Sequence, residues 1–157
     1  MADVAPHARS FGELRPVVLT RLMDVRSSLD PGLAQLDDGG ARAQLGAVLD
    51  QVEGYLRTRD DAPLRAFLRS FLTLRAAQGL ALDSLLHAVV AIGDTCVQVV
   101  QQRGGQDSAD LACALTHAGA RATRLVVEHI ADELDRRTAQ RGAPAPGPEP
   151  EPEDGAS

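Results

Sequence analysis

Apolar residues recur every three or four positions along most of the chain, which is the spacing that places them on one face of an α-helix. Glycine, proline or paired aspartates interrupt this pattern at intervals. No stretch alternates apolar and polar residues with the two-residue period of a strand. We therefore predict an all-α, up-down helical bundle of about five main helices, which we expect over residues 11–29, 41–58, 63–78, 82–102 and 108–140.

Two of these helices differ from the others. Helix 82–102 is apolar on more than one face, so we expect it to lie at the centre, with neighbours on several sides. Helix 108–140 has about thirty residues, or roughly 45 Å at 1.5 Å per residue, which is more than a domain of this size can cover. We expect its C-terminal half to project from the body or to pack against a second subunit.

Local signals mark where the helices begin and end. Pro16 is expected in the first turn of the first helix, where a missing N–H has no cost. Asp60 or Asp61 can cap the third helix. Gly79 fits the position just after a helix end, where left-handed backbone favours glycine.

The two ends of the chain differ in composition from the body. Residues 1–10 show no helical stripe, and we expect them to be flexible. Residues 11–141 are expected to form one helical domain. Residues 142–157, GAPAPGPEPEPEDGAS, are rich in proline and contain acidic but no basic side chains. Such a segment cannot bury enough apolar surface to fold, so we predict a disordered acidic tail.

Composition argues against several classes of partner. Aromatic residues make up 3% of the chain and tryptophan is absent, so a base-stacking platform is not expected. The formal net charge is −6 and no basic patch is evident, so we expect no nucleic-acid partner. The first residues lack the apolar core of a signal peptide, and helix 82–102 is interrupted by charged residues. We therefore expect a cytoplasmic protein with no membrane contact.

Candidate chemistry is sparse. His87 shares the central helix with Asp83 and Asp94, and one histidine with two carboxylates can form a facial metal site. A carboxylate such as Asp83 in the first turn of a helix also stabilises the helix dipole, so its presence requires no metal. We therefore favour a structural role for His87 and predict no metal. Cys96 and Cys113 match no zinc or redox spacing and are expected to be buried free thiols. No nucleophile motif or phosphate loop is present, so we predict that the chain is not an enzyme.

Arg75 stands one turn before the predicted helix end at Gly79. We expect it to bond the last carbonyls of its own helix, where a cation also complements the dipole. Two alternatives are that Arg75 pins the next helix through Asp83, or that it binds an anionic ligand.

Short motifs around Arg75 point to a family. Residues 75–79, RAAQG, end one apolar helix, and residues 82–86, LDSLL, begin the next. With the Tyr55-Leu56 and Asp60-Asp61 pairs before them, these motifs resemble the N-terminal sensory domain of the stressosome co-antagonist (RsbR-type) family. The resemblance implies a globin-like helical sensory domain without haem, which dimerises through long helices and serves signal transduction in a bacterial stress response.

In that family the last helix of the sensory domain leads to an output module. No such module follows Arg141 in this sequence, so we expect residues 11–141 to be a free-standing sensor-like domain. The expected function is non-catalytic signalling or regulation through protein–protein interaction. We expect a homodimer, and a further signalling partner that carries a related sensory domain.

We place the predicted interface on the long last helix. Its C-terminal half carries an apolar stripe and is expected to extend beyond the domain. The predicted interface residues are Leu125, Val126, His129, Ile130, Leu134 and Arg137. An alternative function is a helical carrier or sensor that holds haem, another tetrapyrrole or a lipid in its apolar centre. In that case His87 is the candidate cofactor-binding residue. We favour the first function and predict no cofactor.

Overall fold

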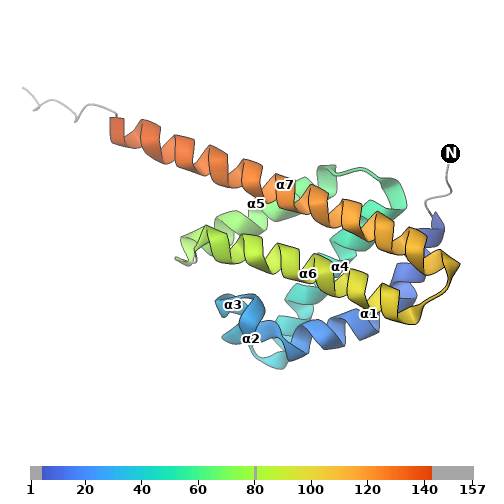
Figure 1. Ribbon diagram of the computed structural model, residues 1–157. Coiled ribbons are helices and arrows are strands. Elements are labelled where there is room, and N and C mark those ends of the chain that lie inside the picture. Colours follow the sequence, from blue (N-terminus) through green and yellow to red (C-terminus); the bar gives the residue numbers. More distant parts are fainter. Residues whose placement is uncertain (1–4, 80, 143–157) are drawn as a thin grey trace, which may run out of the picture.

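The computed structural model describes residues 5–79 and 81–142, and within these residues every regular element is a helix (Figure 1). The helices are α1 (Ala5–Asp24), α2 (Arg26–Leu29), α3 (Pro31–Ala34), α4 (Asp38–Thr58), α5 (Ala62–Ala77), α6 (Leu82–Arg103) and α7 (Gln106–Gly142). The predicted all-α bundle of five main helices with a long C-terminal helix is confirmed. The additional helices α2 and α3 have only four residues each.

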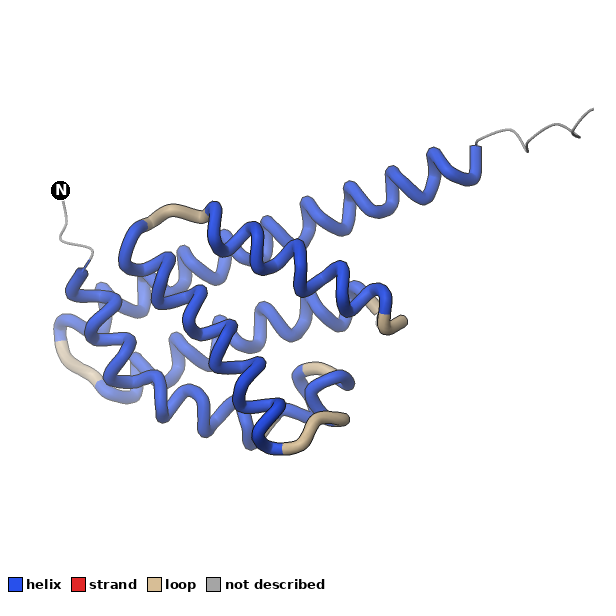
Figure 2. The backbone as a smooth tube through the Cα atoms, turned by 180° about the vertical axis from the view of Figure 1, so that it is seen from behind, coloured by secondary structure: helices blue, strands red, loops and turns tan. Residues whose placement is uncertain are grey.

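The bundle is arranged around the pair formed by α6 and α7, which lie side by side and are joined by a short turn (Figures 1 and 2). That turn uses Gly104 and Gly105, whose φ angles of 72° and 96° are strained for any residue with a side chain. Helix α1 packs against α4 and α6, and α5 packs mainly against α7. Helix α7 continues well past the bundle, as its orange and red end shows.

The N-terminal prediction was wrong in its boundary. Helix α1 begins at Ala5, whereas residues 1–10 were expected to be flexible. The reason is burial, because Ala8 and Phe11 both lie in the core and so anchor the first turns of the helix. Pro16 consequently lies in the interior of α1 and not in its first turn. Residues 1–4 lie outside the described residues.

The helix boundaries follow local chemistry. The side chain of Asp37 accepts a hydrogen bond from the Gly40 N–H at 2.7 Å and caps α4. Before α5, the Asp60 carboxylate accepts from the Ala62 N–H at 3.0 Å. Gly79 has a φ of 77° just after α5, as its position in the sequence predicted.

Helix α6 is long and apolar enough to cross a membrane by length and composition alone. In the bundle it packs against α7, α1 and α5, and Leu85, Ile92, Cys96 and Val100 are buried. This placement agrees with the central position that its apolar pattern predicted. The helix is not covered on every side, because Asp83, His87, Val90 and Asp94 form an exposed face. Helix α6 approaches the backbone of α7 closely at Gly93, where an added Cβ would lie 3.7 Å from the Cα of Gly119.

The buried side chains form two clusters, which we name the main core and the α5 core. The main core joins α1, α4, α6 and the first half of α7, and its largest fully buried members are Phe11, Leu22, Leu45, Leu49, Leu56 and Leu111. The α5 core lies beneath α5 and consists of Leu64, Leu68, Leu72, Leu85, Leu125 and Val126. Helices α6 and α7 contribute to both clusters.

The predicted acidic tail over residues 142–157 falls almost wholly outside the described residues. Gly142 is the last residue of α7, and residues 143–157 are not described. Helix α7 has 37 residues, or roughly 55 Å at 1.5 Å per residue. It is therefore longer than the helix expected from the sequence.

Candidate functional site

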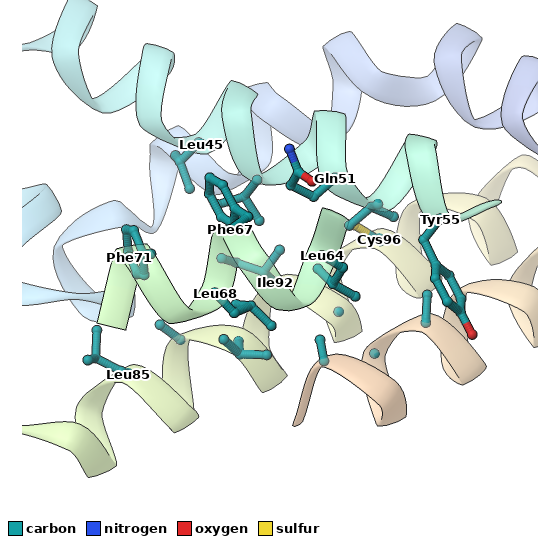
Figure 3. A pocket seen from close by; sticks show the side chains of 18 of the residues that line it. Leu45, Gln51, Tyr55, Leu64, Phe67, Leu68, Phe71, Leu85, Ile92 and Cys96 are labelled. Carbon is teal, nitrogen blue, oxygen red and sulfur yellow. The ribbon is translucent and has the colours of Figure 1, made fainter. Parts of the chain in front are cut away.

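A cavity of about 70 Å³ lies between the main core and the α5 core. Its walls come mainly from α4, α5, α6 and α7 (Figure 3). Asp30 and Leu33, near α3, also line it. Several of its lining residues, including Val48, Tyr55 and Phe67, are only half-buried. The cavity is therefore open to solvent on the side of α4 and α5.

The walls of the cavity differ in the size of their side chains. On the α6 and α7 side, the lining includes the small residues Ala88, Gly93, Ala118, Gly119 and Ala122. On the other side, larger residues of α4 and α5 line it, and these are Gln44, Leu45, Val48, Gln51, Val52, Tyr55, Leu64, Phe67, Leu68 and Phe71. The close approach of α6 and α7 requires the small residues, and the same residues leave the space unfilled.

A buried charge pair stands at the Asp30 end of the cavity. Asp30 is 1% exposed and Arg75 is 3% exposed. Nη2 of Arg75 lies 2.8 Å from Oδ2 of Asp30 and donates a hydrogen bond of 2.8 Å to Oε1 of Gln44. The guanidinium also lies 5.0 Å from the centre of the Phe71 ring. This cluster ties α5 to α4 and to the turn before α3.

The charge pair is incompletely hydrogen-bonded. Oδ1 of Asp30 accepts from the Gly32 N–H at 3.0 Å. Oδ2 of Asp30 and Nε of Arg75 have no hydrogen-bond partner among the described residues, since the 2.8 Å approach of the charges lacks the alignment of a hydrogen bond. Buried polar atoms without a hydrogen-bond partner are rare in folded proteins.

The structure places Arg75 differently from the sequence-based expectation. Arg75 was expected to bond the end of its own helix or to reach Asp83, and it pairs instead with Asp30, far away in the sequence. Gly32 permits this pairing, because a Cβ at that position would lie 1.8 Å from Nη1 of Arg75. The Asp-Pro-Gly sequence before α3 signals only a helix break, so nothing local revealed the pair.

The two cysteines have different environments. Cys96 is buried and lines the cavity, and burial raises the pKa of its thiol to about 12. Cys113 is exposed, so the expectation that both thiols are buried was wrong for this one. Cys113 lies on the outer face of α7, between the buried neighbours Ala112 and Ala114.

His87 does not face the apolar centre. His87, Asp83 and Asp94 are all exposed on α6, and none of them lines the cavity. No group of three or more metal-ligating side chains occurs among the described residues. The cavity has no histidine in its lining. The alternative in which His87 holds a haem or tetrapyrrole in the apolar centre is therefore contradicted, because His87 faces solvent.

The predicted interface residues divide into three groups. Leu125 and Val126 are buried in the α5 core of a single chain, so they are not surface residues and cannot form a free interface. His129 and Ile130 are half-buried, and Ile130 packs against the α5 core. The side chains of Leu134, which is 55% exposed, and of Arg137 are open to solvent.

The projecting end of α7 carries an apolar stripe that extends beyond the predicted set. Val127 is 48% exposed, and with Ile130 and Leu134 it follows the spacing of one helix face. Every residue from 131 to 142 is exposed, except for the half-buried Glu133. Val126 and Val127 point about 100° apart around the helix, and only the packing of α5 shows that Val126 is the buried one and Val127 the exposed one.

Charge is divided along this end of α7. Four acidic residues, Glu128, Asp132, Glu133 and Asp135, precede three basic residues, Arg136, Arg137 and Arg141. Within the helix, Glu133 pairs with Arg136 at 3.1 Å and with Arg137 at 3.0 Å. The hydrogen bond from Arg137 and the positive charge of Arg136 hold the pKa of Glu133 below its usual value.

Comparisons with protein-family models, with curated proteins and with solved structures found no match to this chain. The family resemblance of the segment around Arg75 therefore stays a prediction.

Proposed function

We propose that this chain is a non-catalytic regulatory module that pairs with a second copy of itself through the projecting end of α7. The observation that carries the proposal is an apolar stripe at the point where α7 leaves its own bundle, made of the exposed Val127 and Leu134 with the half-buried Ile130 between them. A helix with this pattern gains stability by burying its stripe against another helix. The proposal agrees with the signalling role in the cytoplasm that the RsbR-type resemblance implies.

We assign the pair an antiparallel orientation. Around the helix, Arg137 lies roughly 60° and Glu133 roughly 100° from Leu134, on the same side. If two antiparallel α7 helices cross at Leu134, Arg137 of one copy therefore borders the contact beside Glu133 of the other and can pair with it. The antiparallel arrangement also keeps the two bundles at opposite ends of the paired helices.

The direct test is the mass in solution, measured by light scattering on a sizing column. We expect the native chain at twice 16.6 kDa and the Leu134→Glu variant at the mass of one chain, because the substitution places a charge in the apolar contact. Leu134 is a better test than Ile130, which also supports the α5 core. A native chain that runs as a monomer would overturn the proposal.

Two further variants control the test. Ala139→Glu adds the same charge to the same exposed segment, but roughly 140° around the helix from Leu134, and should leave the dimer intact. Arg137→Glu places an acid beside Glu133 of the second copy in the antiparallel pair and should weaken dimerisation. An unchanged dimer would contradict the antiparallel orientation.

A further inference from the structure

The cavity between α4 and α5 combines three features: an apolar lining, an elongated shape and a polar end. Along α4, the lining residues run from Gln44 to Tyr55, a distance of roughly 16 Å at 1.5 Å per residue. Leu64, Phe67 and Phe71 of α5 stand opposite them, and the two phenylalanines point toward α4 (Figure 3). Several of these residues are only half-buried, so the cavity opens to solvent between the two helices.

Two polar side chains, Asp30 and Gln44, line one end of the cavity. Oδ2 of Asp30 is buried and lies 2.8 Å from Nη2 of Arg75, but it accepts no aligned hydrogen bond from the described residues. It can therefore accept one from a donor that enters this end. Because Oε1 of Gln44 accepts from Arg75, the amide nitrogen of Gln44 is the group left to donate. A head group that donates to Asp30 and accepts from Gln44 would satisfy both side chains.

We propose that this cavity is a binding site for a short aliphatic molecule with one uncharged head group, of the alcohol or carboxamide class. The aliphatic body lies between α4 and α5, and the head group bonds Asp30 and Gln44. A carboxylate is disfavoured because it would face the carboxylate of Asp30. An ammonium is disfavoured because Arg75 already balances the charge of Asp30, and a second buried cation would be uncompensated.

The floor of the cavity offers the variants that test this site. Ala118 of α7 and Ala88 of α6 both line it and are buried, so leucine at either position occupies the space that the ligand requires. Ala120 is an exposed residue on the outer face of α7, and Ala120→Leu is the matched control. The melting temperature of each variant shows whether it folds. Two filling variants on different helices are used so that the test still holds if one of them does not fold.

The experiment is calorimetric titration of the full chain with 1-hexanol, hexanoate and hexylamine at neutral pH. We expect 1-hexanol to bind about tenfold more tightly than either charged analogue, and to slow the reaction of Cys96 with a thiol reagent. Ala118→Leu and Ala88→Leu should abolish both effects, and Ala120→Leu should retain them. No binding of 1-hexanol, or unchanged binding in a folded filling variant, would overturn the site. Equal affinity for a charged analogue would overturn the head-group assignment.

This inference concerns the interior of one chain and does not depend on the α7 interface. Leu134→Glu should therefore bind 1-hexanol as the native chain does. The two proposals can fail separately.

Discussion

The main core and the α5 core are built from similar aliphatic residues but are completed in different ways. The main core closes around large side chains with no exposed area, such as Phe11, Leu22 and Leu49. The α5 core leaves a cavity of about 70 Å³ on one side, and Leu64 and Leu68 of α5 retain a little exposed surface. Packing therefore holds α1, α4 and α6 together more completely than it holds α5.

The difference shows how α5 is kept in place. Where apolar contact is incomplete, a buried charge pair between Arg75 and Asp30 joins α5 to the turn before α3. Such a pair adds little net stability, because both charges lose their hydration. It does restrict the position of α5, because a shift of the helix would leave a buried charge without its partner. We infer that the main core supplies stability, while the charge pair fixes the position of α5 beside the cavity.

The largest effect is expected from a truncation in the main core. Phe11→Ala should lower the free energy of unfolding by about 4 kcal/mol, because Phe11 has no exposed surface and its removal leaves a void. Phe67→Ala, on the half-buried rim of the cavity, should cost only about 1 kcal/mol. Urea unfolding followed by circular dichroism measures both. Equal losses would show that the cavity side is packed as fully as the main core.

A smaller effect is expected at the charge pair. Asp30→Ala should cost about 3 kcal/mol, because it leaves the guanidinium of Arg75 buried without a counter-charge. Hydrogen exchange should speed up in α5 and change little in α1 and α4, which the main core holds. Uniformly faster exchange would contradict the local role of the pair.

The double variant Asp30→Leu with Arg75→Met is the control for that experiment. Apolar side chains of similar volume often replace a buried ion pair at little cost. The double variant should therefore recover most of the stability that Asp30→Ala loses. A double variant as unstable as the single one would show that the apolar replacements do not fill this site.

The features predicted correctly from the sequence are those that depend on local signals. Helical spacing gave the five main helices, and Gly79 ends α5 in the left-handed conformation that its position indicated. The central place of α6 followed from its apolar residues on several faces. Each of these depends on residues within a few turns of one another.

The features that sequence reasoning missed depend on contacts between distant segments. Asp30 looks like a helix breaker until the fold brings Arg75 to it. The burial of Leu125 and Val126 depends on where α5 crosses α7, which the apolar stripe of α7 does not specify. The cavity arises because small residues of α6 and α7 face large ones of α4 and α5, a property of four helices together.

The smallest effect, at pH values up to about 9, concerns Cys96, which lines the cavity from α6. Burial raises the pKa of its thiol to about 12, so between about pH 9 and pH 12 the folded chain keeps this proton while the unfolded chain, with a thiol pKa near 8.5, loses it. The unfolded state then binds fewer protons, and the free energy of unfolding falls as the pH rises, by at most about 1.4 kcal/mol per pH unit. Below about pH 8 this contribution is constant.

The variant Cys96→Val isolates this contribution, because valine cannot ionise and fills a similar volume. Other groups also titrate in this range, so the quantity to measure is the difference in urea-unfolding free energy between the native chain and the variant, followed from pH 7 to above pH 9. We expect the native chain to lose stability faster than Cys96→Val in the alkaline range, and Cys113→Ser to behave like the native chain because Cys113 is exposed. Parallel curves for the native chain and Cys96→Val would show that water or hydroxide reaches the thiol through the cavity, and that the α5 side of the bundle is open even where the static structure buries it.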